Sequence, residues 1–206
     1  RAIADHSDKT YTLLYTKHTA LKIGMFALER MVQVMEMTQA GMVYADHYQQ
    51  IDGVQKTAPV IDYQPGSLRD DFNFGSVLLF NANAFKEVIE NTEEEYQYAG
   101  LYDLRLKISQ KSKLVHINEY LYTEVESDKR KSGEKQFDYV DPKNRQVQIE
   151  MEQACTNHLK EIGGYLYPIF RPVDFSSHTL EYEASVIIPV RNRIRTVKDA
   201  VRSALN

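Results

Sequence analysis

The feature that most constrains the fold is an alternation of short apolar runs with a helical pattern near the start of the chain. Residues 10–16 (TYTLLYT) are β-branched and aromatic, which is typical of a buried strand. Residues 20–39 carry apolar side chains at three- and four-residue spacing, which predicts an amphipathic helix with Thr19 as its N-cap. A second apolar run, residues 42–45, ends at Asp46-His47. Strand, helix and strand with short connections form the βαβ unit of a parallel sheet. We therefore expect an α/β fold with a mostly parallel sheet flanked by helices.

The next segment, residues 48–71, is polar and contains Gly53, Pro59, Pro65 and Gly66. This composition predicts a long loop with one edge strand at residues 58–63, and a long loop in a compact domain is often functional. The remaining pattern predicts strands at 74–80 and 113–117, and helices starting at Asn81 and covering 98–110 and 147–162.

Composition excludes several classes of protein. The chain has 206 residues, 43% hydrophobic and 26% charged, which is the balance of a globular protein. The net charge of −4 gives no excess of positive charge for nucleic acid or an anionic membrane, so we expect no nucleic-acid partner. The single cysteine, Cys155, favours a reducing compartment. The mostly polar residues 1–10 argue against a signal peptide. We expect a cytoplasmic protein, membrane-peripheral at most in its full-length form.

The character of the chain changes near its end. Residues 171–183 read as a linker, whereas Ala184 to Val190 is a clean apolar run that predicts a buried strand. A helix is expected to start at Thr196. We therefore divide the chain into residues 1–170, a linker, and residues 184–206. An apolar strand without a sheet of its own predicts packing on the first domain or on another chain, and hence a homo-oligomer through 184–206.

The last segment resembles the opening of family 2 glycosyltransferases. The shared pattern is a strand ending in Pro189, a short turn with Asn192, and a helix that ends in Ser203-Ala204-Leu205. This match covers about the last tenth of the chain. The resemblance implies that Pro189, Arg191 and Asn192 contribute to a nucleotide-sugar donor site.

The preceding residues resemble the back half of a domain of the same kind. Residues 11–17 stand where the family has a strand that ends in metal-binding acids, and residues 43–46 stand where it has a Tyr-x-Asp strand. Residues 75–80 resemble the strand near the acceptor, and residues 117–122 resemble the Glu-x-Leu-Tyr strand that closes the sheet. The resemblance implies a partial GT-A fold. It also implies transfer of a sugar from a nucleotide-sugar donor to a glycan or a lipid-linked acceptor.

The donor side departs from the family pattern. Tyr15-Thr16-Lys17 replaces the metal-binding acids, so no carboxylate is available there for Mg²⁺ or Mn²⁺. Either Lys17 supplies the missing positive charge to a diphosphate, or it is a solvated lysine at a strand end. Lys17 and Asp46 are therefore the donor-binding candidates of this domain, and a Mg²⁺ or Mn²⁺ ion is expected only in an intact second domain.

The catalytic side departs as well. Gly100-Leu101 stands where the family has its acid pair, and Asp103 is the nearest carboxylate. Asp71 is a second candidate base, and Asp70, Phe74 and Ser76 are candidates for acceptor binding. The plainer alternatives are that Asp103 is a helix-surface or salt-bridged acid, and that the acids at 70 and 71 pair with Arg69 in solvent.

Three alternative hypotheses stay open. A metal site could form from His18, Asp46 and His47. The domain could be a non-catalytic GT-A-like module that binds the acceptor or scaffolds an active glycosyltransferase domain. It could also be nucleotidyltransferase-like, because that fold is similar at this level of detail.

Overall fold

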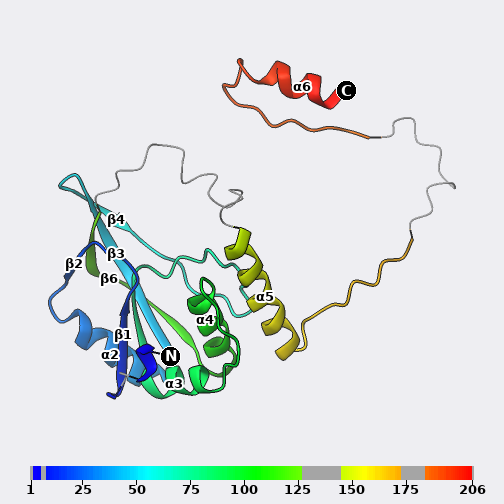
Figure 1. The fold of residues 1–206 in the computed structure, drawn as a ribbon. Helices are drawn as coiled ribbons and strands as arrows, with labels where there is room; N and C mark the ends of the chain where they lie inside the picture. The colour runs from blue at the N-terminus through cyan, green and yellow to red at the C-terminus, as the bar shows by residue number, and fades with distance from the viewer. Residues whose placement is uncertain (1, 6–7, 127–144, 173–183, 206) are drawn as a thin grey trace. The chain divides into compact units, whose positions relative to one another are not determined.

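A computed structural model describes residues 2–5, 8–126, 145–172 and 184–205. The chain divides into two compact units, Arg1–Leu166 and Tyr167–Asn206 (Figure 1). Most of the predicted linker, residues 173–183, lies outside the described residues, as does the charged loop expected at 127–136.

The first unit is a mixed α/β domain. Its strands are β1 (Tyr11–Tyr15), β2 (Ala20–Ile23), β3 (Met42–Ile51), β4 (Val54–Ala58), β5 (Val77–Asn81) and β6 (Leu114–Glu126). Its helices are α1 (Ala2–Asp5), α2 (Ala27–Thr38), α3 (Ala82–Glu90), α4 (Gly100–Lys111) and α5 (Arg145–Glu161).

The sheet has the order β1-β5-β3-β6-β2, and β4 pairs with β3 outside this path. Among the strands of the described residues, β3 and β6 pair in parallel and the other pairings are antiparallel. The prediction of a mostly parallel sheet is therefore wrong. The predicted strands before and after the first helix do run in the same direction, but β5 lies between them and runs the opposite way.

The long helix predicted from Ala20 is also shorter than expected. Residues Ala20–Ile23 form an edge strand paired with the second half of β6, and the helix begins only at Ala27, so Thr19 is not its cap. Gly24 marks the break because its amide donates to the Leu121 carbonyl at 2.9 Å. A Cβ at position 24 would lie 2.7 Å from that oxygen, so only glycine allows this close approach.

The predicted loop at 48–71 begins later than expected. β3 continues to Ile51 and turns through Asp52-Gly53 into β4, so the edge strand precedes residues 58–63. A segment without helix or strand then runs from residue 59 to residue 76. The predicted helix start at Asn81 is confirmed, since its side chain accepts hydrogen bonds from the amides of Asn83 and Ala84.

The sheet is covered on both faces. One face packs Val43, Ala45, Val77 and Leu79 against Met31 and Met35 of α2. The other face packs Met42, Tyr44 and Phe80 against α3 and α4, and α5 lies against α4 (Figure 1). This arrangement places the N-terminal turn of α4 and the 59–76 segment on the same side of the sheet.

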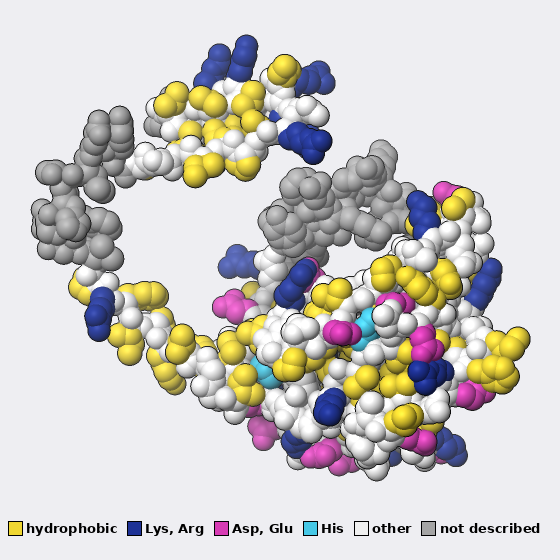
Figure 2. Space-filling model, turned by 180° about the vertical axis from the view of Figure 1, so that it is seen from behind, with side chains coloured by type: hydrophobic (Ala, Val, Ile, Leu, Met, Phe, Trp, Pro, Cys, Tyr) yellow, Lys and Arg dark blue, Asp and Glu magenta, His cyan; other side chains and the backbone are white. Residues whose placement is uncertain are grey.

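The second unit does not contain the predicted buried strand. Residues 184–190 are extended without a strand partner among the described residues, and Val186 and Ile187 are 64% and 87% exposed. Helix α6 (Val197–Leu205) begins one residue after the predicted start. Hydrophobic side chains of residues 166–170 and of this unit lie on the surface (Figure 2). Within the described part of the chain, no helix is long and apolar enough to cross a membrane.

Candidate functional site

Strand direction brings several predicted site residues to one edge of the sheet. β1, β3 and β6 run the same way and β5 runs against them, so β1 ends where β5 starts, and β3 and β6 continue past this level. Lys17 follows β1, Ser76 precedes β5, and the Thr16 amide donates to the Ser76 carbonyl at 2.9 Å. Ligands of α/β sheets commonly bind at such an edge.

The polar groups at this edge bind one another. Lys17 Nζ donates to Glu124 Oε2 at 2.5 Å, and His47 Nε2 lies 3.4 Å from Glu124 Oε1. We call these three side chains the ion cluster. The side chain of Glu124 is 1% exposed. Burial alone would raise the pKa of Glu124, but the hydrogen bond from Lys17 and the nearby positive charges hold it below its usual range. Glu124 is therefore ionised and offsets the charge that was expected to face a diphosphate.

The residues at the end of β1 do not fit a divalent cation. An ammonium stands where a hard oxygen ligand would be needed, and it is already bonded to the nearest buried carboxylate. In the residues that the structure describes, no three His, Cys, Asp or Glu side chains are grouped to hold a metal ion. Asp46 contacts His116 whereas His47 packs on Tyr122, and the described residues include no group of three ligands here, so these side chains do not form the alternative metal site with His18.

Tight packing closes the space beside the ion cluster. The Tyr122 ring stacks on His47 with ring centroids 5.0 Å apart, and its hydroxyl accepts from the Ser76 amide at 2.9 Å. Gly75 has φ +73°, and a Cβ there would lie 2.2 Å from the Tyr122 hydroxyl oxygen. Ser76 is 1% exposed, so it is part of this packed region and not of an open acceptor surface.

Asp46 has a positioning role in the structure. Its Oδ1 accepts from the Val60 amide at 2.8 Å and lies 2.9 Å from His116 Nε2. The other imidazole nitrogen of His116 lies 2.8 Å from Asp62 Oδ1. The Tyr44 hydroxyl adds a bond to the Ile61 carbonyl at 2.8 Å. Asp46 and its neighbours thus fix residues 60–62 on the sheet.

Two side chains of α4 hold the middle of the same loop. The Tyr102 hydroxyl donates to the Leu68 carbonyl at 2.5 Å. The terminal nitrogens of Arg105 donate to the carbonyls of Ser67 and Arg69 at 2.8 and 2.6 Å. Arg105 is 4% exposed, and its guanidinium carbon lies 4.8 Å from the Tyr102 ring centroid. The loop is therefore anchored to both the sheet and α4.

Between the loop, the sheet and α4 lies a cavity of about 250 Å³, which we call the aromatic pocket. Its lining combines apolar and aromatic side chains with two charged residues: Met42, Asp70, Phe72, Phe74, Leu78, Tyr98, Leu101, Tyr102, Arg105 and Met151. Asp70 and Phe74, both predicted to bind an acceptor, line this pocket together. Leu101, which stands at the position of the family's acid pair, lines it as well. Ser76 is not among its lining residues.

Asp71 is held in an exposed ion pair with Arg69. The Arg69 Nε and Nη2 atoms donate to its two carboxylate oxygens, each at 2.9 Å. This pairing, more than any other contact, holds the pKa of Asp71 below its usual range. Both side chains are exposed, so the pair matches the plainer alternative stated from the sequence.

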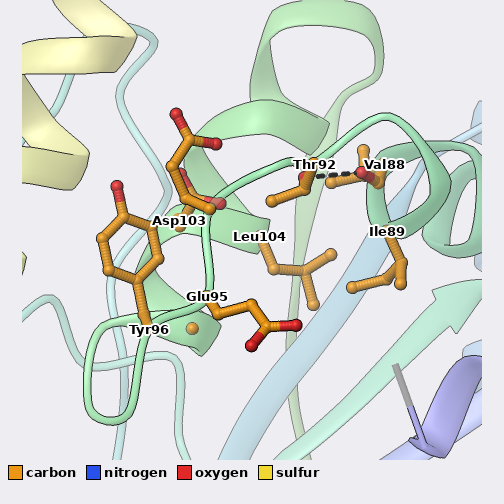
Figure 3. Close-up of a pocket in the computed structure, with 9 residues that line it drawn as sticks. Val88, Ile89, Thr92, Glu95, Tyr96, Asp103 and Leu104 are labelled. Carbon is orange, nitrogen blue, oxygen red and sulfur yellow. Dashed lines mark hydrogen bonds between the residues drawn. The ribbon is translucent and has the colours of Figure 1, made fainter.

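Asp103 lines a different pocket, of about 310 Å³, on the other side of α4. Glu95 and Tyr96 from the preceding segment, Thr92, and Leu104 of α4 surround it (Figure 3). Burial raises the pKa of Asp103, and Lys107 opposes this by donating from 2.9 Å. Asp103 is thus a buried, salt-bridged acid that lines a different pocket from Asp70 and Phe74.

The predicted donor residues of the second unit are all exposed. Pro189, Arg191 and Asn192 precede α6, and Asn192 has a left-handed φ of 55°.

Sequence reasoning missed the residues that organise the pocket. The sequence pattern assigns no site role to Arg105, Tyr102 or Glu150. Glu150 of α5 accepts from the amides of Tyr98 and Ala99 at 2.7 and 3.2 Å, which fixes Tyr98 at the pocket. The number of tyrosines, 14, was the available signal because it suits a polar, sugar-sized groove.

No protein-family model matches the chain, and no curated protein matches it.

Proposed function

We propose that this protein is part of a glycosyltransferase similar to family 2 and uses a nucleotide-sugar donor. In this proposal, residues 1–166 are a GT-A-like module that binds the acceptor and carries no transfer chemistry. The observation that carries the proposal is the aromatic pocket, since it joins the acceptor candidates Asp70 and Phe74 to Leu101, where the family has its acid pair.

The arrangement of strands supports the resemblance. The segments matched to the metal strand, the acceptor strand, the Tyr-x-Asp strand and the closing strand are β1, β5, β3 and β6. They are adjacent in the sheet in that order. The four segments that resemble strands of the family are therefore neighbours in one sheet, as expected if they belong to one site.

The state of the acids supports the non-catalytic assignment. Asp46, Asp71 and Asp103 are engaged by His116, Arg69 and Lys107 respectively. Lys17 is bonded to Glu124 and does not carry a free charge toward a diphosphate. Sugar transfer would then depend on the domain that begins near residue 184.

Calorimetric titration of the 206-residue chain tests this proposal. We expect no saturable binding of UDP-, GDP- or CMP-sugars, with or without Mn²⁺, and saturable binding of one or more glycosides from a panel. Tyr98→Ala should abolish glycoside binding. Tyr120→Ala is the matched control, because these tyrosines are 47% and 38% exposed and only Tyr98 lines the pocket. Nucleotide-sugar binding that is lost in Lys17→Ala would contradict the non-catalytic assignment.

A further inference from the structure

We infer that the acceptor bound in the aromatic pocket is a neutral glycoside with an apolar aglycone. The aglycone occupies the floor of the pocket, and the sugar lies at its mouth. This inference rests on the proposed function and narrows it, because glycan and lipid-linked acceptors were both left open by the sequence.

The floor of the pocket is apolar. Met42, Leu78 and Phe74 are buried at its base, and Met151 of α5 completes one wall. A bare sugar presents hydroxyl groups all round, and burying them against these side chains would leave them without hydrogen-bond partners. The floor therefore suits an apolar group.

The size of the cavity limits this group. An apolar cavity of roughly 150 Å³ holds benzene. The aromatic pocket, at about 250 Å³, therefore has room for one aromatic ring or a short alkyl group. A long lipid chain would extend beyond it.

The mouth of the pocket suits a sugar. Tyr98 is 47% exposed there and offers both a ring face and a hydroxyl, while Asp70 offers an exposed carboxylate. Aromatic rings and acidic hydrogen-bond acceptors suit the C–H faces and hydroxyl groups of a sugar.

The charges at the pocket argue against a phosphate group next to the sugar. Asp70 is negative, and the terminal nitrogens of Arg105 are turned to the carbonyls of Ser67 and Arg69. An anion would thus meet the Asp70 carboxylate, and the Arg105 N–H groups that bond these two carbonyls would not be available to it. The acceptor is consequently neutral near its apolar group.

Paired titrations test the inference. We would compare hexyl and methyl β-glycosides of glucose, galactose and N-acetylglucosamine, below the critical micelle concentration, together with hexan-1-ol and hexyl phosphate. For the sugar that binds, the hexyl glycoside should bind at least about tenfold more tightly than the methyl glycoside, which corresponds to burial of about two methylene groups. Hexan-1-ol and hexyl phosphate should bind more weakly than the hexyl glycoside.

A variant and a matched control locate the effect. Leu101→Trp, which narrows the pocket, should abolish the preference for the hexyl glycoside. Leu28→Trp should preserve the preference, because Leu28 does not line the pocket. It is a matched control, since each leucine is the second residue of its helix and their exposed fractions are 41% for Leu28 and 39% for Leu101.

The outcomes separate the two proposals. Equal binding of hexyl and methyl glycosides, or binding of hexan-1-ol or hexyl phosphate as tightly as the hexyl glycoside, overturns the inference and leaves the acceptor role intact. Loss of the preference in both tryptophan variants also overturns it. If no glycoside or oligosaccharide binds, the acceptor role fails as well.

Discussion

The ion cluster and the aromatic pocket lie in one domain but differ in how their side chains pack. In the ion cluster, Lys17 and Glu124 satisfy each other, and Tyr122 and Ser76 fill the adjacent space. In the aromatic pocket, aromatic side chains surround a volume of about 250 Å³ that they do not fill. The difference teaches that charged residues at the expected place can satisfy one another and leave no open site, whereas well-anchored side chains elsewhere can leave a pocket open.

The anchoring of the pocket predicts the largest effect on stability. Arg105→Met should lower the free energy of unfolding by about 2–4 kcal/mol, because it leaves the carbonyls of Ser67 and Arg69 without their donors. Urea denaturation measures this change. Arg105→Lys should not restore stability, since an ammonium lacks the planar fork that reaches both carbonyls. The matched control Arg69→Met should change the value by less than about 0.5 kcal/mol because its guanidinium is exposed. A loss below about 1 kcal/mol in Arg105→Met would mean that this anchor is unimportant.

The closed packing beside the ion cluster predicts a somewhat smaller effect. Gly75→Ala should destabilise the fold by about 2–3 kcal/mol for two reasons. The alanine would have to adopt a backbone φ of +73°, and its Cβ would collide with the Tyr122 hydroxyl. Gly53→Ala is the control for backbone strain alone, since Gly53 has φ +81° and no atom within 4 Å of the added Cβ. It should cost about 1 kcal/mol. Thermal unfolding of both variants measures the difference, and equal losses would show that the space at Gly75 is not closed.

The charge of Glu124 predicts an effect that depends on pH. Glu124→Gln should reduce stability at pH 7 by about 1–3 kcal/mol, because Lys17 and His47 lose their charged partner. The pKa of Glu124 is lowered in the folded protein, so its contribution is present above the ordinary glutamate pKa of about 4.3. It is lost as pH falls through the lowered folded-state value. Denaturation of both proteins from pH 7 to pH 3 should therefore show the two stabilities converging in acid. A difference that is constant with pH would contradict the ion pair.

The exposed pair of Arg69 and Asp71 predicts the smallest effect. Asp71→Asn should change stability by less than about 0.5 kcal/mol, since both partners are exposed. It should also leave glycoside binding unchanged, because Asp71 does not line the aromatic pocket. Asp70→Asn is the informative partner variant and should weaken glycoside binding. If Asp71→Asn weakens glycoside binding more than Asp70→Asn does, the boundary of the pocket is wrong.

Sequence patterns predicted local elements better than their pairing. The helix start at Asn81 depends on its own side chain and two nearby amides, so the sequence nearby is sufficient to find it. The direction of the sheet depends on β5 entering between β1 and β3, which periodicity does not encode. Residues 20–23 have helical spacing, yet they pair with the far end of β6. Here, tertiary contacts override a local preference.

The candidate site was predictable to a similar degree. Asp70 and Phe74 are close in sequence and do line one pocket. Lys17 and Glu124 are 107 positions apart, so nothing local to Lys17 indicates that its charge is already offset. Arg105 was overlooked because its partners are backbone carbonyls, which any sequence provides. Long-range pairing therefore separates the residues whose surroundings the local sequence indicates from those whose surroundings it does not.

Hydrogen exchange with and without the best-binding hexyl glycoside tests the central claim most directly, because it reads both regions in one experiment. The account predicts slower exchange in residues 68–74 and 98–105, which border the aromatic pocket, and unchanged exchange in residues 15–18 and 122–126. Slower exchange at residues 15–18 and 122–126, with no change at 98–105, would contradict it and place ligand binding at the ion cluster.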